Sequence, residues 1–151
     1  IPLTKGIAMK LQMLILSSVL GLMAGTALAG AQVDVYKSPY CGCCGKWAEH
    51  MRAQGFDVKT HEVEDVPGQR KKLGMPDAYG SCHTAKVGNY LIEGHVPAAD
   101  VQRLLKEKPK AVGLAVPSMP PGSPGMESAK PMPYETLLVK ADGSTSVFAR
   151  H

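Results

Sequence analysis

Three of the four cysteines lie close together, at Cys41, Cys43 and Cys44, and the fourth, Cys82, directly precedes His83. A disulfide needs Cα atoms roughly 4.4 to 6.8 Å apart and particular Cβ directions, so three thiols this close cannot all form strain-free disulfides. Thiolate sulfur is a soft ligand that selects copper(I), zinc or iron–sulfur clusters, and clustered thiols are also typical of redox sites. The spacing therefore indicates a soft-metal site, a redox site, or both.

Methionine sulfur discriminates between the soft metals, because a thioether binds copper(I) far better than it binds zinc. Met119 and Met126 lie in a segment rich in proline and glycine, which has little core for a methionine to fill. The imidazole of His83 adds a ligand that both copper oxidation states accept. The predicted metal ligands are therefore Cys41, Cys43, Cys44, Cys82, His83, Met119 and Met126.

Four thiolates in a small volume repel one another. Bridging each sulfur between several cations offsets this repulsion better than a single monovalent ion could. We therefore expect copper as a multinuclear, cysteine-bridged copper(I) cluster.

The remaining histidines give weaker indications. Two interpretations fit His95 equally well: a turn histidine that bonds to the backbone, and a histidine that binds or supports the metal. His50, His61 and His151 are expected to be exposed to solvent. None of these four is included in the predicted ligand set.

An export signal is predicted near the start of the chain. From Met9 the sequence has a basic residue, Lys10, then an apolar stretch, and then small residues up to Ala29. This is the order of a secretory signal peptide, and the apolar stretch is shorter than the roughly 20 residues that a spanning helix needs. We therefore expect an upstream extension and cleaved signal peptide over 1–29, one domain over 30–151, and a periplasmic protein with no membrane attachment after cleavage.

The charge pattern argues against nucleic acid as a partner. The formal net charge of the whole chain is +4, and two of the positive charges, Lys5 and Lys10, belong to the predicted leader. Aromatic residues make up only 5% of the chain, and basic residues alternate with acidic ones, as at 106–108. Such a surface lacks the concentrated positive charge that attracts nucleic acid or an anionic membrane.

Strands and helices are predicted in alternation along the domain. Alternating or helical spacing of apolar residues predicts strands over 33–36, 56–61, 85–87, 90–92, 135–139 and 145–148, and helices over 44–54, 65–73 and 98–108. Gly88-Asn89 and the segment 141–144 are typical hairpin turns. Six prolines and two glycines predict an irregular loop over 117–133.

The predicted elements follow the order of a thioredoxin-like fold, which is strand, Cys-x-x-Cys, helix, strand, helix and closing hairpin. Cys41 and Cys44 are the two cysteines at the start of the first helix. We take 135–148 as the closing hairpin, which makes residues 75–134 contain an insertion. A cis-proline facing the thiols is expected before that hairpin, at Pro133. The predicted fold is therefore α/β, a thioredoxin-like single domain with an insertion.

Several short segments together resemble one protein family. They are Cys-Gly-Cys-Cys-Gly followed by Trp47, and the segments 81–84, 93–97, 113–117 and 119–127. In these segments the chain resembles the CopG family of copper-resistance proteins. The resemblance implies an exported copper-binding protein of thioredoxin-like architecture, with a Cys-x-Cys-Cys copper cluster and a copper redox role. Its expected partners are copper ions and other periplasmic copper-handling proteins.

Three interpretations of the cysteines remain open. The first is an exported protein that holds copper(I) in copper resistance or homeostasis, which explains all four cysteines and the loop methionines. The second is a periplasmic thiol–disulfide oxidoreductase using Cys41 and Cys44, against which Cys43 counts because a third thiol invites mispairing. The third is a structural zinc protein, which leaves the methionines unexplained.

Overall fold

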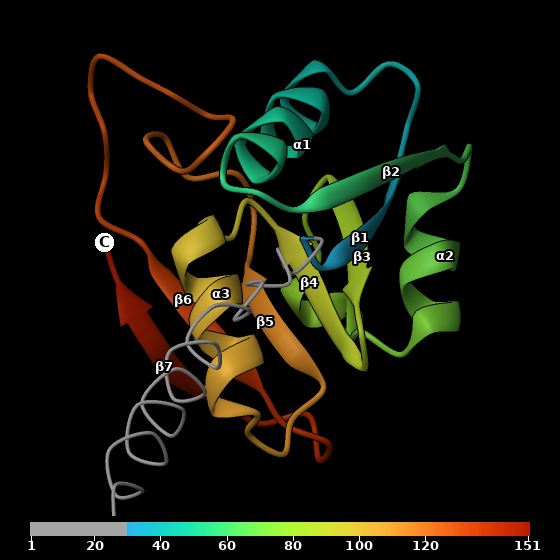
Figure 1. The fold of residues 1–151 in the computed structure, drawn as a ribbon, viewed down its shortest axis with the longest axis vertical. Coiled ribbons are helices and arrows are strands. Elements are labelled where there is room, and N and C mark those ends of the chain that lie inside the picture. The colour runs from blue at the N-terminus through green and yellow to red at the C-terminus, as the bar shows by residue number, and fades with distance from the viewer. Residues whose placement is uncertain (1–29) are drawn as a thin grey trace, which may run out of the picture.

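Strands and helices alternate through residues 30–151, which are the residues that the computed structural model describes; the predicted signal peptide lies outside them. The strands are β1 (Gln32–Lys37), β2 (Asp57–Glu62), β3 (His83–Val87), β4 (Tyr90–Gly94), β5 (Gly113–Val116), β6 (Glu135–Val139) and β7 (Thr145–Arg150). The helices are α1 (Gly42–Ala53), α2 (Val66–Leu73) and α3 (Ala98–Glu107), with a short 3-10 helix, η1, at Asp77–Tyr79. The seven strands form one mixed sheet in the order β2-β1-β3-β4-β5-β6-β7 (Figure 1), which confirms the α/β prediction.

Apolar residues on neighbouring strand positions give the sheet two buried faces, because successive side chains of a strand point to opposite sides. On one face Ile92 of β4 packs in a cluster with Trp47 of α1 and Leu104 of α3. On the other face Leu91 packs in a smaller cluster with Met75. Helices α1 and α3 therefore cover the same face.

No helix within the described part of the chain is long and apolar enough to span a membrane.

The predicted elements are present, with small changes at their ends. Helix α1 begins at Gly42, with Cys41 as its N-cap, so Cys43 and Cys44 fall in its first turn. Gly55 follows α1 with φ of 93°, the left-handed conformation expected there. Strand β5 was not predicted, because all of its four residues are buried and they show no alternation.

The hairpin that completes the expected element order is β3–β4, not β6–β7. Strands β3 and β4 follow α2 and η1 and pair antiparallel, while β1 lies parallel to β2 and antiparallel to β3. Strands β5 to β7 then extend the sheet beyond β4. The added segment therefore follows the closing hairpin instead of preceding it.

The prediction of a cis-proline at Pro133 is wrong, because residues 30–151 contain no cis peptide bond. The physical reason is the change of hairpin. Pro133 precedes β6, whereas the residue directly before the closing hairpin β3–β4 is Cys82. A cysteine thus occupies the place where a proline was expected to face the thiols.

One end of the sheet collects the segments that carry the predicted ligands. Lys37 at the end of β1 pairs with His83 at the start of β3, so the loop leading into α1 meets Cys82. Gly94 at the end of β4 pairs in parallel with Val116 at the end of β5, so the segments after these two strands leave from the same end. The strand pairing alone brings the three ligand-bearing segments together.

Candidate metal centre

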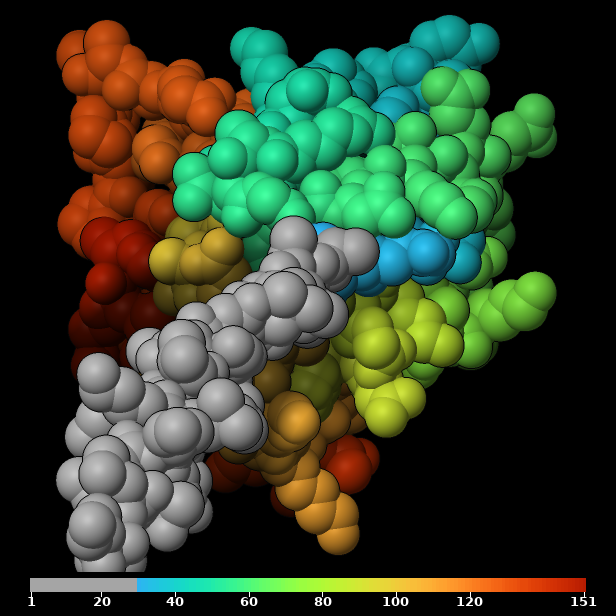
Figure 2. Space-filling model, in the orientation of Figure 1, coloured from blue at the N-terminus to red at the C-terminus, as the bar shows by residue number. Residues whose placement is uncertain are grey.

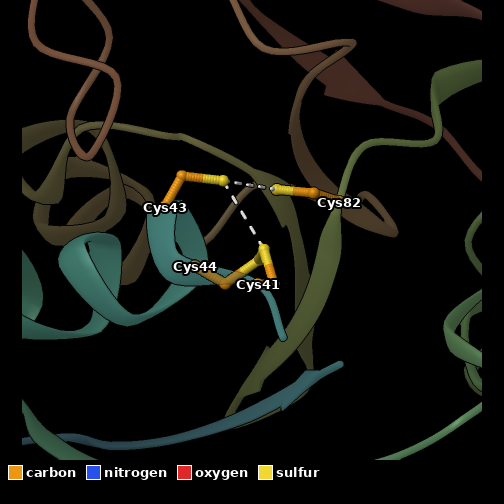
Figure 3. A group of neighbouring side chains, drawn as sticks. All are labelled: Cys41, Cys43, Cys44 and Cys82. Atoms are coloured by element: carbon orange, nitrogen blue, oxygen red, sulfur yellow. Dashed lines mark hydrogen bonds between the residues drawn. A yellow bond between two sulfur atoms is a disulfide. The ribbon is translucent and has the colours of Figure 1, made fainter. Parts of the chain in front are cut away.

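The four cysteine sulfurs all lie within 4.8 Å of one another. Cys41 and Cys44 form a disulfide with Cα atoms 5.4 Å apart, and Cys43 and Cys82 are free. The Sγ of Cys43 lies 3.5 Å from that of Cys41 and 3.8 Å from that of Cys82 (Figure 3). In this structure the predicted set of four thiols is therefore one disulfide and two thiols.

The first turn of α1 separates the two adjacent cysteines. Successive residues of an α-helix point about 100° apart around its axis. Cys44 is directed into the core, where it is fully buried beside its partner Cys41, whereas Cys43 is partly exposed and faces Cys82. Cys44 thus joins the disulfide, and its neighbour Cys43 remains a free thiol.

The spacing of the free thiols fits a single soft metal ion between them. Two thiolates at about 2.3 Å from a tetrahedral ion are about 3.8 Å apart. A third sulfur, the Sδ of Met119, lies 3.9 Å from the Sγ of Cys43. Sulfur atoms from three separate segments therefore meet at Cys43.

His95 contributes an imidazole to the same site. Its Nε2 lies 3.0 Å from the Sγ of Cys82, and its Nδ1 lies 2.7 Å from the carbonyl oxygen of Pro124. A carbonyl can only accept a hydrogen bond, so Nδ1 carries the proton and Nε2 presents its lone pair to Cys82. Metal-binding histidines are commonly held in this way by a backbone carbonyl. His95, which the sequence left open, is therefore a candidate ligand together with Cys82 and His83.

His83 forms the inner wall of the site. Its ring is fully buried, 4.6 Å from the ring of Trp47 and 5.2 Å from that of His95, and its Nδ1 lies 3.4 Å from the Sγ of Cys82. Burial, and to a smaller extent the neighbouring His95, lower the pKa of His83 to about 3. His83 is therefore neutral at ordinary pH, with a ring nitrogen directed at Cys82.

The proline-rich loop 117–133 lies beside α1 (Figures 1 and 2) and brings Met119 to Cys43 and the Pro124 carbonyl to His95. Gly125 makes the closest approach: a Cβ atom there would lie 2.8 Å from the carbonyl oxygen of Cys43 and 3.1 Å from Nδ1 of His95. Its φ of 88° is also a conformation that glycine adopts without steric cost. The loop can therefore pack closely enough to bring Met119 to Cys43.

Comparison with known proteins identifies the family. Two solved structures described as copper resistance protein CopG, Form 2 and Form 1, each share 41% sequence identity with this chain. Each match covers 81% of this chain and 98% of the other, with TM-scores of 0.77 and 0.76. The chain belongs to the CopG family. A family model described as a protein of unknown function, DUF411, matches residues 79–126. No curated protein matches the chain.

The DUF411 match covers only part of this CopG-family site. It begins in η1 and includes the segments that carry Cys82, His83, His95 and Met119. The cysteines of α1 lie before it. The likeness to the CopG structures, in contrast, extends over most of the chain.

Met119, Met126 and His50 of this CopG-family chain have different surroundings in the structure. Within residues 30–151, Met119 is the methionine whose sulfur lies within 4 Å of a cysteine sulfur. Met126 is half-buried in the same loop, where its backbone bonds to Gly122 and Ser123. The prediction of an exposed His50 is wrong, since this ring is half-buried and its Nε2 accepts a hydrogen bond from the Ala98 N–H at 3.0 Å.

Cys82 is protonated in this arrangement. Burial raises the pKa of the Cys82 thiol to about 12, and the neighbouring Cys43 contributes to the rise. The thiol can therefore donate to the lone pair of His95, whose own pKa is lowered by burial. A metal ion that binds Cys82 has to displace this proton.

Proposed function

We propose that this protein binds copper(I) through Cys43, Cys82, His95 and Met119 and acts in copper resistance or homeostasis. The observation that carries the proposal is the thioether of Met119, 3.9 Å from a thiol that is itself 3.8 Å from a second thiol. Thiolate and thioether ligands together select copper(I). The two solved CopG structures, described as copper resistance proteins, support the same assignment.

The proposal includes a larger cluster when the disulfide is reduced. Cys41 and Cys44 would then add two thiolates to a set whose sulfurs lie within 4.8 Å of one another, which favours several bridged copper(I) ions. The two imidazoles bind both copper oxidation states, so the site is suited to a copper redox role. His83 and Met126 remain proposed ligands of this cluster.

The proposed location is the periplasm. It rests on the signal-peptide pattern that ends at Ala29, in the residues outside the described part of the chain. Copper ions are the proposed ligand, and other periplasmic copper-handling proteins are the proposed partners.

A second candidate function is thiol–disulfide exchange. The disulfide between Cys41 and Cys44 at the start of α1 favours it, because a helix N-terminus stabilises a thiolate there. Cys43 argues against it, since its Sγ lies 3.5 Å from that of Cys41 and competes for the same disulfide.

Purification of the mature protein from copper-supplemented periplasm tests the proposal, with metal identity, stoichiometry and free thiols measured on one sample. We expect copper to be bound and the thiols of Cys43 and Cys82 to be protected. Almost no copper together with two disulfides would contradict the proposal, and a zinc equivalent that resists copper exchange would favour a structural zinc site.

Cys43→Ser should lower the copper content and spare any disulfide reductase activity; the opposite pattern would favour the oxidoreductase.

Copper(I) affinity is expected to rise with pH. The pKa of Cys82 is raised to about 12, so at neutral pH this thiol holds a proton that copper(I) must displace. Below that pKa the apparent affinity should increase about tenfold per pH unit for each proton released. Competition titrations between pH 6 and 8, corrected for protonation of the competing chelator, measure this slope. Cys82→Ser should reduce the slope by the contribution of one proton, and a flat profile for the wild type would contradict the expectation.

A further inference from the structure

Arg70 of α2 and Glu93 of β4 form a buried ion pair behind the metal site. The Nε of Arg70 donates to Oε1 of Glu93, and the two side chains are only 6% and 0% exposed. A buried ion pair contributes little to stability on its own, because the cost of desolvating both charges offsets their attraction. The contacts that the pair makes with its surroundings therefore indicate its role.

Both members of the pair hold the backbone of Ser81. The carboxylate of Glu93 accepts a hydrogen bond from the Ser81 N–H at 3.0 Å, and Nη2 of Arg70 donates to the Ser81 carbonyl oxygen at 2.6 Å. Strand β3 begins only at His83, so Ser81 lies outside the hydrogen-bond ladder of the sheet. The ion pair supplies the hydrogen bonds to the Ser81 backbone that the sheet does not, and it thereby fixes the backbone directly before Cys82.

Ser81 in turn holds the second ligand-bearing segment. Its hydroxyl donates to the carbonyl oxygen of Ser118, the residue before Met119. Ser118 has φ of 60°, a left-handed conformation that is uncommon for a residue other than glycine, so an external contact is needed to keep it. The contacts of Ser81 thus reach both Cys82 and Met119, whose sulfurs lie 3.8 and 3.9 Å from that of Cys43.

We propose that Arg70 and Glu93 are positioning residues, which hold Ser81 so that Cys82 and Met119 meet Cys43 at ligand spacing. The inference rests on the proposed copper(I) function. Neither side chain supplies a ligand atom, so the pair acts through the backbone. Residues that support metal ligands from outside typically change metal affinity roughly 10–100-fold when they are lost.

The double variant Arg70→Leu/Glu93→Leu separates positioning from stability. Replacing both members of a buried ion pair by apolar residues is often neutral or stabilising, whereas removing one member leaves an unpaired buried charge. Leucine is preferred to methionine because it adds no thioether. Arg70→Lys is the second variant: its charge still pairs with Glu93, but a single ammonium lacks the planar fork that also reaches Ser81. Thr136→Val, which removes a buried hydroxyl bonded to Asp100, is the matched control.

Phenylarsine oxide and copper(I) are the two probes, used on the full domain with the Cys41–Cys44 disulfide intact. The arsenical needs two neighbouring thiols, so its capture reports the placement of Cys82 opposite Cys43 without any copper chemistry. In folded double and Arg70→Lys variants we expect the affinity for each probe to fall about tenfold or more. Thr136→Val should stay within about twofold of the wild type, because the Thr136 hydroxyl contacts Asp100 and His151 and shares no partner with the proposed ligands.

Unchanged affinity for the arsenical in a folded double variant would overturn the inference. If that variant does not fold, as judged by thermal unfolding, Arg70→Lys decides the question in the same way. A wild type that captures the arsenical but binds no copper(I) would contradict the proposed function, and the arsenical result for the variants would still decide the positioning role.

Discussion

Replacing Cys82 by serine is expected to cause the largest loss of copper(I) affinity of any single substitution at the site. The Sγ of Cys82 lies 3.0 Å from Nε2 of His95, 3.4 Å from Nδ1 of His83 and 3.8 Å from the Sγ of Cys43. Cys82 thus connects the thiol of Cys43 with both imidazoles. Its loss should lower the affinity about a hundredfold or more, which corresponds to about 2.7 kcal/mol. Competition with a copper(I) chelator under anaerobic conditions measures it.

Two methionine variants are the comparison for the loss of copper(I) affinity in Cys82→Ser. Met119→Leu removes the thioether next to Cys43, and because this side chain is 45% exposed we expect a smaller loss than for Cys82→Ser. Met132→Leu makes the same substitution in the same loop at a side chain that is 60% exposed, and should have no effect. Cys82→Ser with near wild-type affinity, or equal effects of the two leucine variants, would contradict the assigned ligand set.

Local sequence patterns predicted most of the elements but not their long-range pairing. The alternation in β1 and the turn Gly88-Asn89 depend on neighbouring residues and were interpreted correctly. Which hairpin completes the fold depends on contacts between distant segments, and two good hairpin patterns were present. The later one, around Gly143, has the stronger turn pattern, and a closing hairpin there predicts the cis-proline at Pro133.

The position of His95 beside Cys82 could have been predicted from the sequence. A two-residue turn at Gly88-Asn89 fixes the register of the hairpin, and the pairing of Thr84 with Glu93 follows from it. Continuing this register by two residues places His95 opposite Cys82. The predicted strands were too short for this step, since they ended before the residues that carry the ligands.

The thiol state and the supporting ion pair could not be predicted in the same way. Whether Cys41 pairs with Cys43 or with Cys44 depends on where the first turn of α1 begins, and helix ends are the least certain part of such predictions. Arg70 and Glu93 look like ordinary surface charges in the sequence. Their role emerges only when α2 and β4 are both placed next to Ser81.

Reducing the disulfide between Cys41 and Cys44 is expected to raise the copper(I) stoichiometry at least about twofold. In the oxidised protein Cys43 and Cys82 are the free thiols, and reduction adds two more sulfurs within 4.8 Å. Four thiolates this close repel one another, so additional copper(I) ions that bridge them should bind with high affinity. Anaerobic titration of oxidised and pre-reduced protein, after removal of the reductant and with thiols counted on each sample, measures the change.

The double variant Cys41→Ser/Cys44→Ser shows whether these two sulfurs cause the increase. It keeps Cys43 and Cys82, so it should bind as much copper(I) as the oxidised wild type, with or without reductant. Equal stoichiometry for oxidised and reduced wild type would mean that the disulfide sulfurs stay outside the cluster, and an increase that persists in the double variant would place the additional copper elsewhere. Because Cys43 and Cys82 lie 3.8 Å apart and neither belongs to the disulfide, the expected pattern is a basal site of two thiols that reduction enlarges.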